Sequence, residues 1–198
     1  MHHDLRGALG SGRLWTLAAI YFCIVLAFYG VSFWLPQILQ QLSGYPSAAV
    51  ALISAVPYVV AAIGMVVVGA RSDRTGERRW HVAVPALVGA LGFAAAASVP
   101  PSVALSLTAL SVAALGIWGA LGPFWALPTA FLRGRAAAGG VALVNAVGNV
   151  GGFVGPTLVG YARDATGSFA TGLWVLAGGL VLGAILTLCL PPEPGSGG

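Results

Sequence analysis

The chain has 198 residues, of which 58% are hydrophobic and 7% are charged, and its mean hydropathy is +0.92. Because an ordinary soluble domain has about 25% charged residues, this composition excludes a water-soluble globular domain and indicates a chain solvated by lipid. All nine basic residues are arginines that lie between apolar stretches. That pattern favours membrane orientation and gives no support to a nucleic-acid-binding surface.

Six apolar stretches follow one another, each long enough to cross a bilayer as a helix of about 20 residues. Glycine, proline, serine and charged residues interrupt the apolar pattern between them. The spans are expected at residues 14–39, 48–69, 81–98, 103–132, 136–161 and 169–190. The sequence therefore predicts an all-α membrane protein whose helical bundle covers residues 14–190, with short segments at residues 1–13 and 191–198.

The arginines are divided unevenly between the two ends of the expected bundle. If successive spans alternate in direction, Arg163 lies at one end and the other eight arginines lie at the opposite end. Basic residues beside membrane helices favour the cytoplasmic side. We therefore expect a multi-pass protein of the cell (inner) membrane, with both the N-terminal segment 1–13 and the tail 191–198 in the cytoplasm.

The first and fourth spans contain similar motifs near their ends. Residues 32–39 read SFWLPQIL and residues 123–131 read PFWALPTAF. Because the two spans run in opposite directions, the match predicts two inverted three-helix repeats, a plan that is common in secondary transporters. The alternative is that aromatic residues and prolines recur near the ends of many membrane helices.

The fourth span also contains three residues that disfavour a continuous helix, namely Gly122, Pro123 and Pro128. Proline removes a backbone hydrogen bond and kinks a helix. We expect the helix to break at this point, so that it bends and carries Trp125 and Thr129 along the wall of a cavity. Non-helical backbone is tolerated in membranes where it lines such a cavity.

A glycine, an aspartate and several arginines follow a regular spacing between the second and third spans. The pattern G-x-x-x-D-R-x-G-x-R-R is matched by Gly69, Asp73, Arg74, Gly76, Arg78 and Arg79. It resembles the cytoplasmic loop signature of the major facilitator superfamily, in the copy between helices eight and nine. The resemblance implies a latch in which Asp73 pairs with an arginine while Gly76 permits a left-handed turn. The alternative is an ordinary basic loop that follows the positive-inside rule.

Longer stretches extend this resemblance to one branch of the superfamily. Residues 28–39, 72–83 and 122–169 are similar to the anion:cation symporters, the phthalate and tartrate permease group. The similarity covers residues 5–190 and implies proton-coupled symport of an organic anion by alternating access. Members of that branch have twelve helices, and the six helices here match helices seven to twelve. The resemblance therefore implies a partner, an N-terminal six-helix half.

Two amide side chains lie in the fifth span, where Asn145 and Asn149 are four residues apart and share one helix face. Unpaired amides are costly in lipid. They either bond between packed helices or line a cavity that binds substrate oxygens. In the resembling symporters an asparagine of this helix lines the substrate cavity, so we expect at least one of the two to bind substrate. Trp125, Thr129 and the hydroxyl of Tyr29 complete the candidate substrate-binding set.

The expected spans contain no aspartate, glutamate, lysine or arginine. In the resembling family the proton-carrying acids and the arginine that binds the substrate carboxylate belong to the first six helices. The spans also lack paired acids and an H-E-x-x-H motif, so we expect no enzymatic activity, no cofactor and no metal site. Two alternatives stay open: a non-transporting six-helix assembly partner and an inactive fragment of a split transporter gene.

Overall fold

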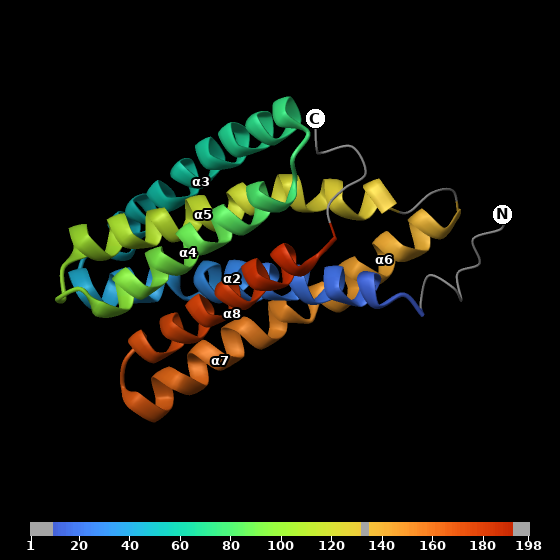
Figure 1. Ribbon diagram of the computed structural model, residues 1–198. Coiled ribbons are helices and arrows are strands. Elements are labelled where there is room, and N and C mark those ends of the chain that lie inside the picture. The colour runs from blue at the N-terminus through green and yellow to red at the C-terminus, as the bar shows by residue number, and fades with distance from the viewer. Residues whose placement is uncertain (1–9, 132–134, 192–198) are drawn as a thin grey trace.

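The computed structural model describes residues 10–131 and 135–191 of the chain. Within these residues the structure contains helices and no strand (Figure 1). The helices are α2 (Gly12–Ser43), α3 (Ser47–Thr75), α4 (Arg79–Ser98), α5 (Val103–Phe131), α6 (Arg135–Asn149), α7 (Gly151–Thr166) and α8 (Ala170–Cys189). They provide six candidate membrane spans, because α6 and α7 together form one span over Ala137–Thr166. The prediction of an all-α protein with six spans is confirmed.

Several helices run further than the apolar pattern indicates, because a helix ends where its capping is provided. α3 continues past Gly69 and includes Asp73 before it ends at Thr75. The C-cap Gly76 has φ +68° and donates its N–H to the carbonyl of Ser72. Glycine adopts this left-handed conformation without steric cost. The left-handed turn expected at Gly76 is therefore present, and part of the expected loop belongs to a helix.

The packing of the helices repeats between the first three spans and the last three. α2, which begins the first triplet, packs mainly against α6, α7 and α8, the later helices of the second triplet. α5, which begins the second triplet, packs mainly against α3 and α4, the later helices of the first. α2 also contacts α5, and α4 contacts α8. Each helix of one triplet therefore has an equivalent in the other triplet with equivalent neighbours. Successive spans run in opposite directions in Figure 1, so the two three-helix repeats are inverted relative to each other.

The core lies along α2 and α5, the central helices of this arrangement. α2 contributes Ile20 and Ile24, which are almost fully buried, and α5 contributes Ile117, Phe124 and Leu127. In lipid there is no hydrophobic gain from bringing two apolar helices together, so the contact depends on van der Waals packing at short range. Close approach of the helix backbones is therefore the main structural requirement.

Glycines provide this close approach at two contacts between the triplets and their partner helices. A Cβ atom on Gly116 of α5 would lie under 3.0 Å from backbone atoms of Gly89 and Pro85 in α4. On α7, a Cβ atom on Gly155 would collide with the backbone carbonyl of Leu26 in α2. Both positions therefore have room only for the hydrogen of glycine, as expected for small-residue contacts between membrane helices.

The helix is not interrupted at Gly122, Pro123 and Pro128, so the predicted break in α5 is wrong. α5 runs without a gap from Val103 to Phe131, with both prolines inside it. A proline removes one backbone hydrogen bond, and the neighbouring turns of α5 keep the helical path. The fifth span is the one that is interrupted, at Val150 between α6 and α7.

The residue before the interruption, Asn149, has a side chain that competes with the helix backbone for a hydrogen-bond acceptor. The Asn149 amide nitrogen donates to the backbone carbonyl of Asn145 at 2.8 Å and to its side-chain oxygen at 2.8 Å. Asparagine side chains often replace helical backbone bonds in this way. At the junction the N–H of Val150 bonds to the carbonyl of Val147 at 3.2 Å, a tighter 3₁₀-type turn.

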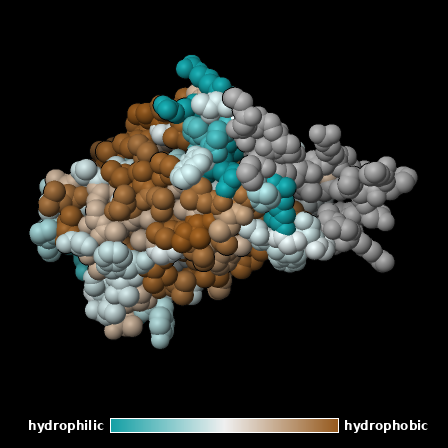
Figure 2. Space-filling view, viewed as in Figure 1, coloured by the Kyte–Doolittle hydropathy of each residue, from teal (hydrophilic) through white to brown (hydrophobic). Residues whose placement is uncertain are grey.

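The surface of the bundle is arranged as a membrane protein requires. Figure 2 shows a broad hydrophobic area on the visible face, with hydrophilic residues gathered at the end near the α3–α4 connection. Exposed apolar side chains follow one another along α3, including Leu52, Val59, Ile63 and Val66. Such a surface is costly in water and favourable in lipid.

Candidate functional site

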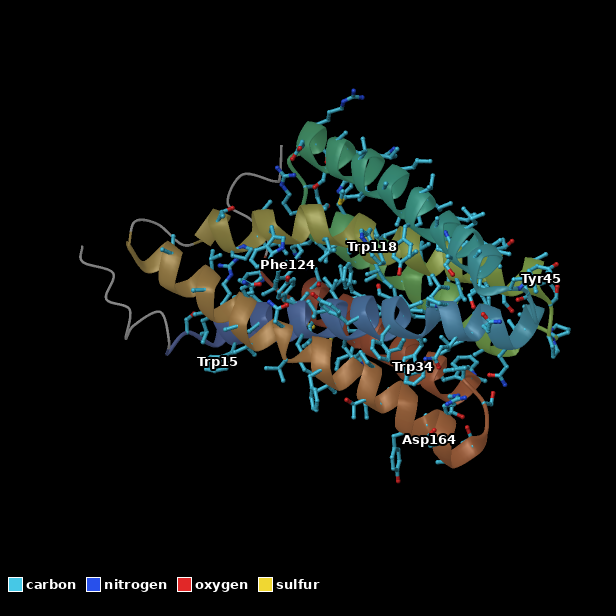
Figure 3. All side chains as sticks on the ribbon, turned by 180° about the vertical axis from the view of Figure 1, so that it is seen from behind. Trp15, Trp34, Tyr45, Trp118, Phe124 and Asp164 are labelled. Carbon is cyan, nitrogen blue, oxygen red and sulfur yellow. The ribbon has the colours of Figure 1, made fainter. Side chains whose placement is uncertain are left out.

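Aromatic side chains of α2 and α5 meet near the middle of the bundle. Tyr21 stacks on Phe124 with ring centroids 5.2 Å apart and meets the edge of Trp125 at 4.7 Å. Phe124 is fully buried, whereas Trp125 is half-buried. In Figure 3, Phe124 and Trp118 lie along α5, facing the ribbon of α2. Trp125 is therefore positioned by two neighbouring rings, with part of its surface left accessible.

A second group of aromatic side chains lies further along α2, toward the α2–α3 connection. Trp118 of α5 lies 4.4 Å from Phe28 of α2 and 5.7 Å from Tyr58 of α3, between ring centroids. Phe28 in turn contacts Tyr29 at 4.9 Å. Rings at these separations attract each other through their quadrupoles. Tyr29 and Tyr58 are partly exposed, at 44% and 38%, so their side chains lie at the border of this group.

The α6–α7 span contributes glycines beneath the tyrosines of α2. A Cβ atom on Gly148 would collide with the ring of Tyr21, and one on Gly152 would lie 3.0 Å from the ring of Tyr29. These two glycines bracket Asn149 in the sequence. The structure therefore places Tyr21 and Tyr29 directly against the segment that carries the asparagine pair.

Asn145 and Asn149 are bonded to each other and exposed on the same side of the span. Their amide groups lie near the middle of Ala137–Thr166, the least buried of the six candidate spans. Two amides facing lipid at that depth would cost free energy. Their exposure is explained if this face of α6 borders a polar cavity or a partner protein.

The structure does not join the candidate residues into one hydrogen-bonded site. In the part of the chain that is described, no hydrogen bond connects the asparagine pair to Trp125, Thr129 or Tyr29. The hydroxyl of Thr129 is exposed and donates to the carbonyl of Ala126 at 2.9 Å. Trp125 instead contacts Tyr21, and Tyr29 contacts Phe28, both on α2. Asn149 lies beside Gly148, which packs against the ring of Tyr21.

Sequence reasoning left out most of the aromatic side chains that hold Trp125 and Tyr29. Tyr21 and Phe124 contact Trp125, and Phe28 contacts Tyr29. A lone tyrosine in an apolar helix gives little signal, because its ring resembles ordinary core packing. The spacing of Tyr21 and Phe28, seven residues apart on one helix face, is the signal that identifies them.

The residues of the α3–α4 connection form a compact polar cluster. Arg78 pairs with Asp73 through Nη1 and Oδ1 at 2.6 Å, and the same nitrogen donates to the Ser72 hydroxyl at 3.0 Å. Ser72 is fully buried and donates to the carbonyl of Glu77 at 2.8 Å. The Asp73 side chain is nevertheless 73% exposed. Its carboxylate is therefore ordered by Arg78 and accessible to another group.

Glu77 lies just before α4, which begins at Arg79. Its carboxylate accepts the backbone N–H of Trp80 at 2.8 Å and lies 2.9 Å from the His81 ring nitrogen Nδ1. A carboxylate in this position satisfies free N–H groups at a helix start and favours the positive end of the helix dipole. Glu77 therefore fixes the start of α4 and is occupied by local contacts.

Arg79 connects the α3–α4 region to the end of α8. One of its terminal nitrogens donates to the backbone carbonyl of Leu188, in the last turn of α8. The final carbonyls of a helix lack partners within the helix, and a cation near them is stabilising. Arg79 is therefore a cap for α8, whereas Arg74 of the same motif is exposed.

Replacing Arg79 with methionine is expected to loosen the end of α8. The change keeps an apolar side chain of similar length but removes the donor to Leu188. Backbone amides near the C-terminus of α8 should exchange hydrogen for deuterium about tenfold faster, because local opening becomes easier. Arg71→Met, at an exposed arginine on α3, is the matched control. Equal exchange in both variants would show that Arg79 does not stabilise this end.

The described residues contain no group of three or more histidine, cysteine, aspartate or glutamate side chains that could hold a metal ion. Their polar groups within the spans include amides, serine and threonine hydroxyls, tyrosines and tryptophans, whereas the charged side chains lie toward the helix ends. Neutral donors and aromatic faces can bind an organic ligand.

Six membrane spans in two inverted repeats, with polar groups exposed near mid-span, define a bundle of the kind that secondary transporters use. The family model described as Major Facilitator Superfamily matches residues 3–156. The chain therefore belongs to the major facilitator superfamily and is a multi-pass membrane protein.

Relatives in the curated proteins agree with this assignment. A protein of Agrobacterium vitis named "Putative tartrate transporter" is 44% identical over 188 residues, which are 95% of this chain and 41% of the relative. The "Putative metabolite transport protein NicT" of Pseudomonas putida is 36% identical, over 96% of this chain and 44% of the relative. The chain thus spans less than half the length of these relatives.

A solved structure shows the same fold at low sequence identity. The bacterial homologue of the human lysosomal transporter Spinster, in an inward-facing and unoccupied conformation, superposes with a TM-score of 0.63 at 18% identity. The superposition covers 92% of this chain and 47% of that one. The six-helix bundle is therefore similar in extent to half of a complete transporter fold.

Proposed function

We propose that this chain is the C-terminal half of an anion:cation symporter that imports an organic acid with protons by alternating access. The observation that carries the proposal is the exposed polar face of the bundle, where Asn145, Asn149 and Tyr29 lie near the middle of apolar spans. A bilayer disfavours such a face, whereas a central substrate cavity between two bundles requires one. The name of the Agrobacterium relative supports a tartrate-like carboxylate as the substrate class.

The proposed substrate contacts divide between two kinds of side chain. Asn145 and Asn149 supply amide groups for carboxylate or hydroxyl oxygens, and Tyr29 and Thr129 supply hydroxyls. Trp125, fixed by Tyr21 and Phe124, supplies an apolar wall with an N–H donor. Near mid-span the described helices offer neither a cation for the substrate carboxylate nor an acid for the proton. Those charges belong to the proposed partner.

That partner is an N-terminal six-helix half that packs against the sparsely buried spans. α3 and the α6–α7 span are the two least buried of the six, and they flank the exposed polar face. Two bundles that rock about a site at their interface are the usual plan of secondary transporters. In our proposal, the partner half covers the asparagine pair and completes the cavity.

The arginine distribution supports the proposed orientation in the cell (inner) membrane. The α3–α4 connection, with its four arginines Arg71, Arg74, Arg78 and Arg79, lies at the end where α2 begins and α8 terminates (Figure 1). Arg163 lies at the opposite end, in the last turn of α7. The positive-inside rule then places both termini in the cytoplasm.

Uptake of a panel of labelled organic acids, including tartrate and phthalate, tests the proposal in cells. Cells that express this chain together with an N-terminal half should accumulate at least one of them above the level of cells that express either half alone. If every acid enters at the background rate, the chain is better described as an assembly partner or an inactive fragment.

We further propose that Asp73 acts as a latch on the cytoplasmic side of that transporter. The carboxylate is ordered by Arg78 but remains largely exposed, so it can exchange its partner when the two halves move. The other residues of the motif support it: Gly69, Gly76, Arg74, Arg78 and Arg79. Of these, Gly76 provides the left-handed turn and Arg79 fixes α8.

Replacing Asp73 with asparagine is expected to lower the uptake rate about three- to tenfold at unchanged protein level. The change preserves size and removes the charge that pairs with Arg78. An exposed ion pair contributes only about 0.2–1 kcal/mol to stability, so folding should be unaffected. Glu193→Gln, the same chemical change in the C-terminal segment of the sequence, is the control. Equal uptake rates for the two variants would refute the latch.

A further inference from the structure

Arg163 and three glutamines line a hollow at the end of the bundle opposite the α3–α4 connection. The cavity has a volume of about 240 Å³ and is bordered by Gln37, Gln40 and Gln41 of α2, by Arg163 and by Phe169. In Figure 3, Trp34 and Asp164, the neighbours of this hollow, lie at the same end as Tyr45. The concentration of amide and guanidinium donors is unusual in so apolar a chain.

The guanidinium of Arg163 is held in place by aromatic rings. Its central carbon lies 5.2 Å from the ring centroid of Phe169 and 5.9 Å from that of Trp34. Trp34 is itself fixed, because its indole N–H donates to the carbonyl of Pro156 at 2.9 Å. Arginine stacked on aromatic faces keeps its N–H donors at the edge of the plane. The cation is therefore oriented while its donors stay available.

Little in the described part of the chain uses these donors. Arg163 has one ionic contact, a long one of 3.8 Å to the highly exposed carboxylate of Asp164, and no hydrogen bond. The Gln40 amide donates to the carbonyl of Tyr45 at 2.7 Å. The side chains of Gln37 and Gln41 make no hydrogen bond within residues 10–131 and 135–191. One guanidinium and two amides are thus free to donate into the hollow.

A larger cavity lies beside this hollow, and most of its lining residues are apolar, together with Gln41, Ser106 and Ser168. It has a volume of about 350 Å³ and shares Gln41 and Phe169 with the first cavity. Its other walls include Leu110 of α5, Leu173 of α8 and Ala97 of α4. A ligand with an anionic head and an apolar body matches this division, because the head would meet Arg163 and the body would contact aliphatic side chains.

We propose that Arg163, Gln37 and Gln41 form an oxyanion-binding site for the carboxylate of a small organic acid or the phosphate of a lipid headgroup. The site lies at the far end of the bundle from Asp73 and near the ends of α2 and α7, away from the mid-span asparagines. The inference does not rest on the proposed transport function, because binding at this end requires neither a second half nor translocation.

Binding of radiolabelled benzoate to the purified 198-residue chain in phosphatidylcholine nanodiscs tests the soluble-acid source. Arg163→Gln should weaken binding about tenfold or more, since a charged, bidentate donor becomes neutral. Gln37→Leu should weaken it several-fold. Arg71→Gln, which removes one exposed arginine at the opposite end, should leave binding unchanged.

Nanodiscs that also contain phosphatidylglycerol test the lipid source, by mass spectrometry of the lipid that remains bound to the released chain. Retention of phosphatidylglycerol that falls in Arg163→Gln but not in Arg71→Gln assigns the site to a lipid phosphate. If Arg163→Gln aggregates, the same two binding measurements are made on the double variant in which Gln37 and Gln41 are replaced with leucine. Unchanged binding of both benzoate and phosphatidylglycerol in a monodisperse variant overturns the proposal.

Discussion

Replacing both Asn145 and Asn149 with alanine is expected to raise the KM for the transported acid by at least about tenfold. A hydrogen bond to a charged group contributes about 1.5–3 kcal/mol, and about 1.4 kcal/mol corresponds to a factor of ten. The effect should fall mainly on KM, because in our proposal the amides bind substrate and do not carry the proton. The measurement is concentration-dependent uptake by the paired halves, normalised to protein in the membrane.

The single variants Asn145→Ala and Asn149→Ala show how much each asparagine contributes to the KM. The Asn149 amide nitrogen donates to the backbone oxygen and to the side-chain oxygen of Asn145, so Asn149→Ala also frees the Asn145 side-chain oxygen. Thr157→Ala is the control, since it removes a hydroxyl of the same span that is not among the proposed substrate contacts and that donates to the Phe153 carbonyl at 2.7 Å. If the double variant transports with the KM of the control, the asparagines do not line the substrate cavity.

Replacing Gly116 with alanine is expected to destabilise the bundle more than any other small change considered. The added Cβ would lie under 3.0 Å from the backbone of α4, and a backbone cannot move aside as a side chain can. Overpacking costs about 1–3 kcal/mol and occasionally more, which corresponds to a fall of about 2–12 °C in the thermal midpoint of a chain of this length.

Thermal unfolding of the purified chain in detergent measures this effect, with Gly178→Ala as the matched control. A Cβ atom on Gly178 would have no neighbour within 4 Å, so that variant should unfold near the midpoint of the parent chain. Equal midpoints for the two variants would mean that α4 and α5 do not pack at the distance seen here.

The number of membrane spans and their helical structure could be predicted from the sequence, because lipid imposes a simple rule. Each span must be long and apolar, and turns must hold the polar residues. The helix ends were less accessible to prediction, because they depend on capping. α3 reaches Thr75 since Gly76 caps it, and a hydropathy pattern carries no such information.

Backbone interruptions were misplaced for a related reason. Pro123 and Pro128 are the strongest local signals against a helix, yet α5 contains both because its packing against α3 and α4 maintains it. The real interruption, at Val150, depends on one asparagine side chain bonding to the preceding turn. That competition is visible only when the side-chain direction is known.

The side chains that surround the candidate residues could not be predicted from the sequence. The asparagine pair, Trp125 and Tyr29 could be selected because polar or aromatic groups stand out in apolar spans. Tyr21 and Phe124, which position Trp125, come from helices far apart in the sequence. Their meeting depends on the inverted packing of α2 against α5, which single-helix periodicity does not encode.

Accumulation of a labelled organic acid by proteoliposomes that contain this chain and an N-terminal half tests the central proposal most directly. With an inwardly directed proton gradient, the paired halves should concentrate the acid above its external level, and a protonophore should abolish the accumulation. This chain alone should give only background entry. Accumulation by this chain alone, or none by the paired halves for any acid in the panel, would contradict the account.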